Sequence, residues 1–128
     1  MGNPQTVLIC DDDELLREFY GRVLKSLGFE YRIAANGDEA IEQIEAHGAL
    51  FCLVVIDLMM PVRTGWEVIQ WMKEHPVYKD IPVIAISGLA NSFDACEQIR
   101  DNCAAVLNKG EFNLAQFAQL VRKHAVTP

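Results

Sequence analysis

The chain has 128 residues, of which 51% are hydrophobic and 23% are charged, and these values predict one globular domain with its own core. Eleven Lys and Arg against eighteen Asp and Glu give a net charge of −7, which argues against direct binding to nucleic acid. No apolar stretch approaches the roughly 18 residues of a membrane span, and no signal pattern opens the chain, so we expect a cytoplasmic protein. The single domain is expected to cover residues 1–128, with a core from about residue 6 to about residue 124.

The four cysteines predict neither a metal site nor a redox motif. No CxxC pair is present, and no histidine stands at zinc-finger spacing from any of them. Three lie in or beside apolar stretches, where reduced thiols pack as small apolar side chains. We therefore expect inert, reduced thiols at Cys10, Cys52, Cys96 and Cys103.

Five short apolar runs alternate along the chain with longer segments of helical period. The runs begin at Val7, Glu30, Leu53, Val83 and Ala105. Several of them are apolar throughout, which is typical of strands that are buried on both faces of a parallel sheet. This alternation predicts an α/β fold made of five βα units, with helices covering both faces of the sheet.

The helical segments are bounded by recognisable start and stop signals. Gly28 follows the first segment, and Pro76 ends the third because the residue before a proline is pushed out of the helical region. Ser92 and Asn113 are suitable N-caps for the last two segments. The predicted helices cover residues 14–27, 38–47, about 65–75, 92–102 and 113–124.

Polar side chains follow four of the five predicted strands. They are Asp11, Asp12 and Asp13 after the first strand, Asp57 after the third, Ser87 after the fourth and Lys109 after the fifth. Because the carboxyl ends of parallel strands share one edge of the sheet, we expect these side chains to converge there. Several carboxylates beside a single lysine repel one another, and a divalent cation relieves that repulsion. Mg²⁺, with its preference for oxygen ligands and an adjacent phosphate, is the expected ion.

Asp57 is the candidate nucleophile of this edge. We expect it to stand exposed at the strand end, apart from the acidic cluster of the first strand. A carboxylate that attacks a phosphoryl group forms an acyl phosphate, and the reaction depends mainly on positioning and on charge neutralisation. The simpler interpretation of each signal alone is structural, since three Asp after a strand often cap a helix and Ser87 before Gly88 often forms a turn.

Four motifs together resemble the receiver domain of bacterial two-component response regulators, the CheY-like family, across essentially the whole chain. The motifs are VLICDDDELLR, VVIDLMMP, PVIAISG and AVLNKG. The resemblance implies a doubly wound, flavodoxin-like fold with a five-stranded parallel sheet in the order 2-1-3-4-5. It also implies a phosphoacceptor that catalyses only its own phosphorylation and slow dephosphorylation, with a histidine kinase or a histidine phosphotransfer protein as donor and an unknown protein as the downstream target.

The resemblance also assigns a role to each residue at the sheet edge. It implies that Asp57 is phosphorylated, that Ser87 contacts a phosphoryl oxygen and that Lys109 pairs with the phosphate. The Mg²⁺ ligands that it implies are Asp11, Asp12, Asp57 and the backbone carbonyl of Met59.

The chain departs from the family pattern at three places. Gly110 follows Lys109 where the family usually has proline, and Val106 stands where an aromatic residue commonly reports phosphorylation. The usual acidic residue before the glycine of the third loop is also missing, since Thr64 precedes Gly65. The absence of an aromatic at position 106 puts the family's usual switching mechanism in doubt, although not the phosphorylation itself.

Two other functions stay open at this stage. The chain could be a receiver-like interaction module that is never phosphorylated. It could also be a phosphatase of the haloacid dehalogenase type, but that family needs a second Asp two residues after the nucleophile, where this chain has Met59. Nucleotide binding through a glycine-rich loop is disfavoured because neither GxxxxGK nor GxGxxG is present.

Overall fold

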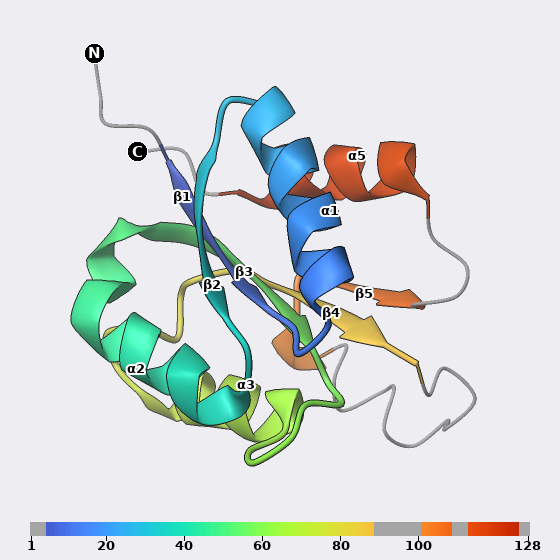
Figure 1. Cartoon of the computed structure of the whole chain (residues 1–128). Helices are drawn as coiled ribbons and strands as arrows, with labels where there is room; N and C mark the ends of the chain where they lie inside the picture. Colours follow the sequence, from blue (N-terminus) through green and yellow to red (C-terminus); the bar gives the residue numbers. More distant parts are fainter. Residues whose placement is uncertain (1–4, 89–100, 109–112, 126–128) are drawn as a thin grey trace.

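The structure is a computed structural model, and it describes residues 5–88, 101–108 and 113–125 (Figure 1). Its strands form one five-stranded parallel sheet in the order β2-β1-β3-β4-β5. The strands are β1 (Thr6–Cys10), β2 (Glu30–Ala34), β3 (Phe51–Asp57), β4 (Val83–Ser87) and β5 (Ala105–Asn108). The predicted doubly wound α/β fold and its strand order are therefore confirmed.

Helices cover both faces of the sheet, with α1 and α5 on one side and α2 and α3 on the other (Figure 1). The helical elements of the described residues include α1 (Glu14–Ser26), α2 (Gly37–His47), the short 3₁₀ helix η1 (Gly48–Leu50), α3 (Gly65–Glu74) and α5 (Leu114–His124). The α-helices α1, α2, α3 and α5 agree with their predictions to within a residue or two, whereas η1 was not predicted. The predicted helix over residues 92–102 and its cap Ser92 lie outside the described residues, apart from Asp101 and Asn102, which are helical.

The sheet separates two hydrophobic clusters because successive side chains of a strand point to opposite faces. Val7 and Ile9 of β1 belong to the cluster that includes Tyr20 of α1 and Phe117 of α5. Leu8, between them, belongs to the cluster under α2 and α3. Every residue of β3 is buried, which explains why the central strands are apolar along their whole length.

Two helix starts follow directly from capping side chains. The Asn113 side chain accepts a hydrogen bond from the backbone N–H of Gln116 at 2.9 Å, as predicted for the cap of α5. At α1, the Asp13 side chain accepts from the N–H groups of Leu15 and Leu16 at 2.9 and 3.2 Å. The third Asp of the acidic run is thus a helix cap, and the other two remain for the site.

Candidate functional site

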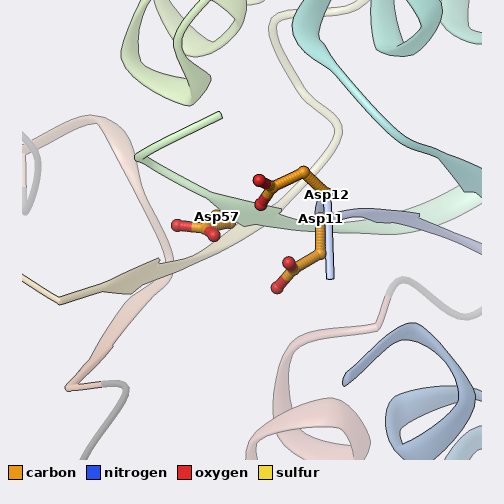
Figure 2. Close-up of side chains that lie close together, drawn as sticks. All are labelled: Asp11, Asp12 and Asp57. Carbon is orange, nitrogen blue, oxygen red and sulfur yellow. The ribbon is translucent and has the colours of Figure 1, made fainter. Parts of the chain in front are cut away.

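The register of the sheet brings three aspartates together at the carboxyl ends of β1 and β3. Cys10 pairs with Ile56, so Asp11 and Asp57 are the next residues on neighbouring strands. One carboxylate oxygen each from Asp11, Asp12 and Asp57 lies within 4.8 Å of the others. Figure 2 shows the three side chains gathered at this edge.

The expectation that Asp57 stands exposed and apart from the acidic cluster is wrong. Asp57 is 1% exposed, the same value as Asp11, and it lies within the cluster. The cause is the loop after β3, which folds back over the strand end instead of leaving it open. The Leu58 N–H donates to the carbonyl of Ile86 at 3.0 Å, and the Gly65 N–H donates to the carbonyl of Leu58 at 3.2 Å.

Backbone donors fix the orientation of both buried carboxylates. The N–H of Asp13 donates to Oδ1 of Asp11, and the N–H of Met59 donates to Oδ1 of Asp57, each at 2.9 Å. Nη1 of Arg17 donates to the backbone carbonyl of Asp11 at 2.8 Å. Such charge-assisted hydrogen bonds offset part of the cost of burying a carboxylate and hold it in one orientation.

The arrangement of the three carboxylates is suited to a divalent cation. Two like charges this close repel each other by roughly 3 kcal/mol at the effective dielectric of a partly buried site. A hard cation with oxygen ligands removes that repulsion, and one exposed member, Asp12, leaves the site open to solvent and to a phosphate. The cluster could therefore hold a metal such as Mg²⁺.

Thr64, which stands where the family usually has an acidic residue before Gly65, is the N-cap of α3. Its hydroxyl accepts a hydrogen bond from the N–H of Glu67 at 3.2 Å, and an Asp side chain at this position could accept the same bond. Gly65 itself is required by close packing, because a Cβ there would collide with the backbone carbonyl oxygen of Asp57. This contact places the start of α3 directly against the candidate nucleophile's backbone.

The rest of the loop is fastened to the start of α2. Val62 adopts a left-handed backbone conformation with φ of 71°. The next residue, Arg63, donates from Nε to Asp38 at 2.8 Å and lies 3.7 Å from Glu67. Gly37 allows this approach, because a Cβ there would meet the carbonyl of Arg63.

Ser87 lies beside Asp57 at the same edge of the sheet. Asp57 is paired with Ile86, so Ser87 comes one residue further along the neighbouring strand, and it is 5% exposed. Ser87 is itself paired with Asn108, the last residue of β5. Lys109 lies outside the described residues, although Asn108 brings the chain to this edge.

Tyr20 is a neighbour of the site that the sequence analysis did not single out. It is completely buried, and burial raises the pKa of its hydroxyl, with the negative charges of Asp11, Asp57 and Asp13 raising it further. Helical spacing indicated that this face of α1 is buried. No sequence signal showed that the acidic end of the sheet lies near enough to influence its pKa.

The cysteines that the structure describes are reduced thiols, as predicted. Cys10 and Cys52 are buried and Cys103 is half-buried. Burial raises the pKa of the Cys10 thiol, and the adjacent Asp11 raises it further. Burial also raises the pKa of Cys103 to about 12. Cys96 lies outside the described residues.

Comparison with known proteins agrees with this architecture. Residues 7–122 match the family described as "Response regulator receiver domain", so the chain belongs to that family. Domains of this family generally accept a phosphoryl group and interact with kinases or phosphotransfer proteins.

Individual relatives differ widely in length. The polar-differentiation response regulator DivK of Brucella anthropi is 29% identical over 122 residues, which cover 94% of this chain and 96% of that protein. The cyclic-nucleotide phosphodiesterase regA of Dictyostelium discoideum is 37% identical over 84 residues, which cover 66% of this chain but only 11% of that protein. This chain therefore corresponds to a whole protein in one case and to a small part of a larger one in the other.

Solved structures share the fold over nearly the whole chain. The receiver domain of Francisella response regulator 1452 is 25% identical with a TM-score of 0.83, over 96% of this chain and 97% of that one. The Vibrio cholerae chemotaxis protein CheY4 has a TM-score of 0.81 at 24% identity, over 95% and 99% of the two chains. Among the described residues no helix is long and apolar enough to cross a membrane, and the cytoplasmic location stays a prediction.

Proposed function

We propose that this chain is a phosphoacceptor that takes a phosphoryl group from a histidine kinase or a histidine phosphotransfer protein onto Asp57. The observation that carries the proposal is the buried carboxylate of Asp57 beside Asp11 and Asp12 at the carboxyl edge of a receiver-family sheet. A carboxylate oxygen of Asp57 attacks phosphorus while the bond from phosphorus to the donor's histidine nitrogen breaks. The bonding electrons stay on that nitrogen, and Asp57 becomes an acyl phosphate.

The hydrogen bond from Met59 orients the nucleophile. It holds Oδ1 of Asp57 by a hydrogen bond of 2.9 Å and so fixes the plane of the carboxylate. Burial of Asp57 excludes most water from this carboxylate, which favours transfer to the positioned oxygen over competing hydrolysis. We assign Ser87, on the adjacent strand end, to contact a phosphoryl oxygen. Lys109, one residue after the described end of β5, is assigned to pair with the phosphate.

The residues present fit a Mg²⁺ ion. The carboxylates of Asp11, Asp12 and Asp57 would hold it together with the backbone carbonyl of Met59. When bound, the ion neutralises charge on the phosphoryl oxygens during transfer. Without it, the same carboxylates would repel an approaching phosphate, so we expect phosphorylation to require the metal.

The phosphatase alternative lacks its general acid. The residue two positions after Asp57 is Met59, whose thioether cannot donate a proton to a leaving group. The phosphorylated chain is then the product of the reaction rather than an intermediate in turnover. We propose that the phosphorylated chain acts on a downstream protein, which is either a separate partner or an attached output domain.

The test is phosphorylation by acetyl phosphate with Mg²⁺, read by intact mass. Wild type should gain the mass of one phosphoryl group, and Asp57→Asn should gain none. Asp38→Asn is the matched control, because it also removes one carboxylate near the loop but lies outside the cluster. An unmodified wild type would refute the proposal and favour an interaction module that is never phosphorylated. Equal modification of Asp57→Asn would refute Asp57 as the acceptor.

A further inference from the structure

The loop between β3 and α3 is held in place differently in its two halves. Leu58 and Met60, in the first half, are buried in the hydrophobic cluster under α2 and α3. Pro61, Val62 and Arg63, in the second half, are all exposed. Burial of apolar side chains therefore fixes the first half, and the second half depends on other interactions.

The second half of the loop contains a strained turn. The N–H of Arg63 donates to the carbonyl of Pro61 at 2.8 Å, which closes a three-residue turn with Val62 at its centre. The φ of Val62 is 71°, and a turn of this kind with a positive φ at its centre is the rare, strained form. Val62 is the only non-glycine residue with a positive φ in the part of the chain that the structure describes. A β-branched residue is costly in this conformation, so neighbouring contacts are needed to hold the turn.

Arg63 makes those contacts. Its Nε donates to Oδ1 of Asp38, at the start of α2, at 2.8 Å, and its Nη1 lies 3.7 Å from Oε2 of Glu67 on α3. Its backbone carbonyl packs against Gly37, where a Cβ would collide with it. A single residue of the turn is therefore tied to both helices that flank the loop.

The loop that contains this turn contacts Asp57 on either side of the turn. The N–H of Met59, before the turn, donates to Oδ1 of Asp57 at 2.9 Å. Gly65, after the turn, packs against the carbonyl of Asp57 and donates its N–H to the carbonyl of Leu58 at 3.2 Å. Release of the turn would therefore loosen the backbone groups that orient the Asp57 carboxylate.

We propose that Arg63 is a positioning residue for Asp57. Its ion pairs with Asp38 and Glu67 hold the strained turn at Val62 closed, and the closed loop keeps its backbone donor in place for the carboxylate. The inference rests on the proposed function, because it concerns the same carboxylate. The carboxylate itself is present with or without the ion pairs, so Arg63→Gln and Asp38→Asn should still be modified by acetyl phosphate to the same final extent.

The first test measures hydrogen exchange at the backbone amide of Met59 by NMR, without metal or phosphoryl donor. Arg63→Gln should speed this exchange about 3-fold to 5-fold, because exposed ion pairs contribute modestly to stability. Lys25→Gln is the matched control, because it breaks an ion pair of similar exposure, between Lys25 and Glu30 at 2.6 Å, outside the loop. Exchange that is unchanged in Arg63→Gln, or equally faster in Lys25→Gln, would overturn the inference.

A second test separates strain in the turn from a general effect of the lost charge. Glycine adopts a positive φ without strain, so adding Val62→Gly to Arg63→Gln should return the exchange at Met59 to within about 2-fold of the wild-type rate. Val62→Ala is the matched control, because alanine also lacks the branched methyl groups but keeps the Cβ that makes this conformation costly. Added to Arg63→Gln, it should leave the exchange fast. Equal recovery with glycine and alanine, or no recovery with glycine, would contradict the role assigned to the ion pairs.

Failure of this inference can be told apart from failure of the proposed function. The exchange measurements need neither Mg²⁺ nor phosphorylation. If Arg63→Gln leaves the exchange at Met59 unchanged while acetyl phosphate still modifies wild type, the inference fails and the proposed function stands. An unmodified wild type would overturn the proposed function, and with it the assignment of Arg63 to a phosphoacceptor, even if the exchange rates differ as expected.

Discussion

The two ends of strand β3 are built in opposite ways. At its carboxyl end, Asp57 is buried beside Asp11 and Asp12, so like charges are held together. At its amino end, Phe51 is buried among apolar side chains beside a cavity of about 230 Å³ that Val77 and Ile81 help to line. The amino end contributes stability through packing, whereas the carboxyl end gives up stability to hold neighbouring carboxylates, among them the proposed phosphoacceptor.

Aromatic contacts extend the packing at the amino end. The rings of Trp71, His75 and Tyr78 contact one another, and the His75 and Tyr78 rings stack with centroids 4.2 Å apart. Gly48, in the 3₁₀ helix before β3, makes room for the ring of Tyr78. Because the two ends differ in this way, we predict opposite effects on the free energy of unfolding. Loss of an apolar side chain at the amino end should lower it, and loss of a negative charge at the carboxyl end should raise it.

The largest effect is expected at the amino end, from Phe51→Ala. Removing a buried phenyl ring from a packed core costs about 4 kcal/mol of unfolding free energy. Urea unfolding monitored by far-ultraviolet circular dichroism measures this loss. The folded fraction should still be modified by acetyl phosphate, since the acidic site lies at the other end of the strand. A loss below about 1 kcal/mol would show that this end does not carry the stability assigned to it.

Gly65→Ala is expected to have the next largest effect, through the loop that covers the site. The new Cβ would collide with the carbonyl of Asp57 unless the backbone moves. We expect this movement to lower the free energy of unfolding by about 2 kcal/mol. Gly88→Ala is the control for stability, because a Cβ there meets nothing within 4 Å. Equal unfolding midpoints for the two variants would contradict the close contact between the start of α3 and the backbone of Asp57.

The fold was largely predictable because its central strands are buried on both faces. Continuous apolar runs marked β3 and β4, and the parallel sheet then placed Asp11 and Asp57 at a common edge. Helix boundaries followed from local signals such as the cap at Asn113. These features depend on residues close together in the chain or on the general geometry of a parallel sheet.

Two features of the site depend on contacts that the sequence pattern does not contain. The burial of Asp57 arises from a loop that returns to the strand end, where Gly65 donates a hydrogen bond to Leu58, so it could not be inferred from the strand alone. The place of Tyr20 was missed because helical period identifies a buried face but not the partner of a polar atom on it. Both errors concern tertiary contacts.

At the carboxyl end, Asp57→Asn should change stability in the opposite direction from Phe51→Ala. In the presence of a chelator, removing one of three neighbouring negative charges should raise the unfolding free energy by about 1 kcal/mol. Adding Mg²⁺ at about 100 times its dissociation constant should stabilise wild type by about 2.7 kcal/mol, and the variant much less. Lower stability of the variant in chelator would contradict the idea that this end is held under charge repulsion.

The smallest expected difference between the two ends is in the reactivity of two cysteines, and it can be measured without any substitution. Cys10 lies at the carboxyl end of β1, and Cys103 lies just before the amino end of β5. The pKa of each is raised, to about 12 for Cys103, so both thiols stay protonated at pH 8 and react slowly with iodoacetamide. Peptide mapping should find Cys103, which is only half-buried, labelled before Cys10. Faster labelling of Cys10 would indicate that the carboxyl end of the sheet opens to solvent more readily than the amino end.

The most direct test of the central claim is a crystal structure with Mg²⁺ and beryllofluoride, which imitates a phosphoryl group. Our account predicts beryllium bonded to a carboxylate oxygen of Asp57, with the metal on Asp11, Asp12, Asp57 and the carbonyl of Met59. A fluoride group bound elsewhere, or a metal that does not touch these carboxylates, would contradict it.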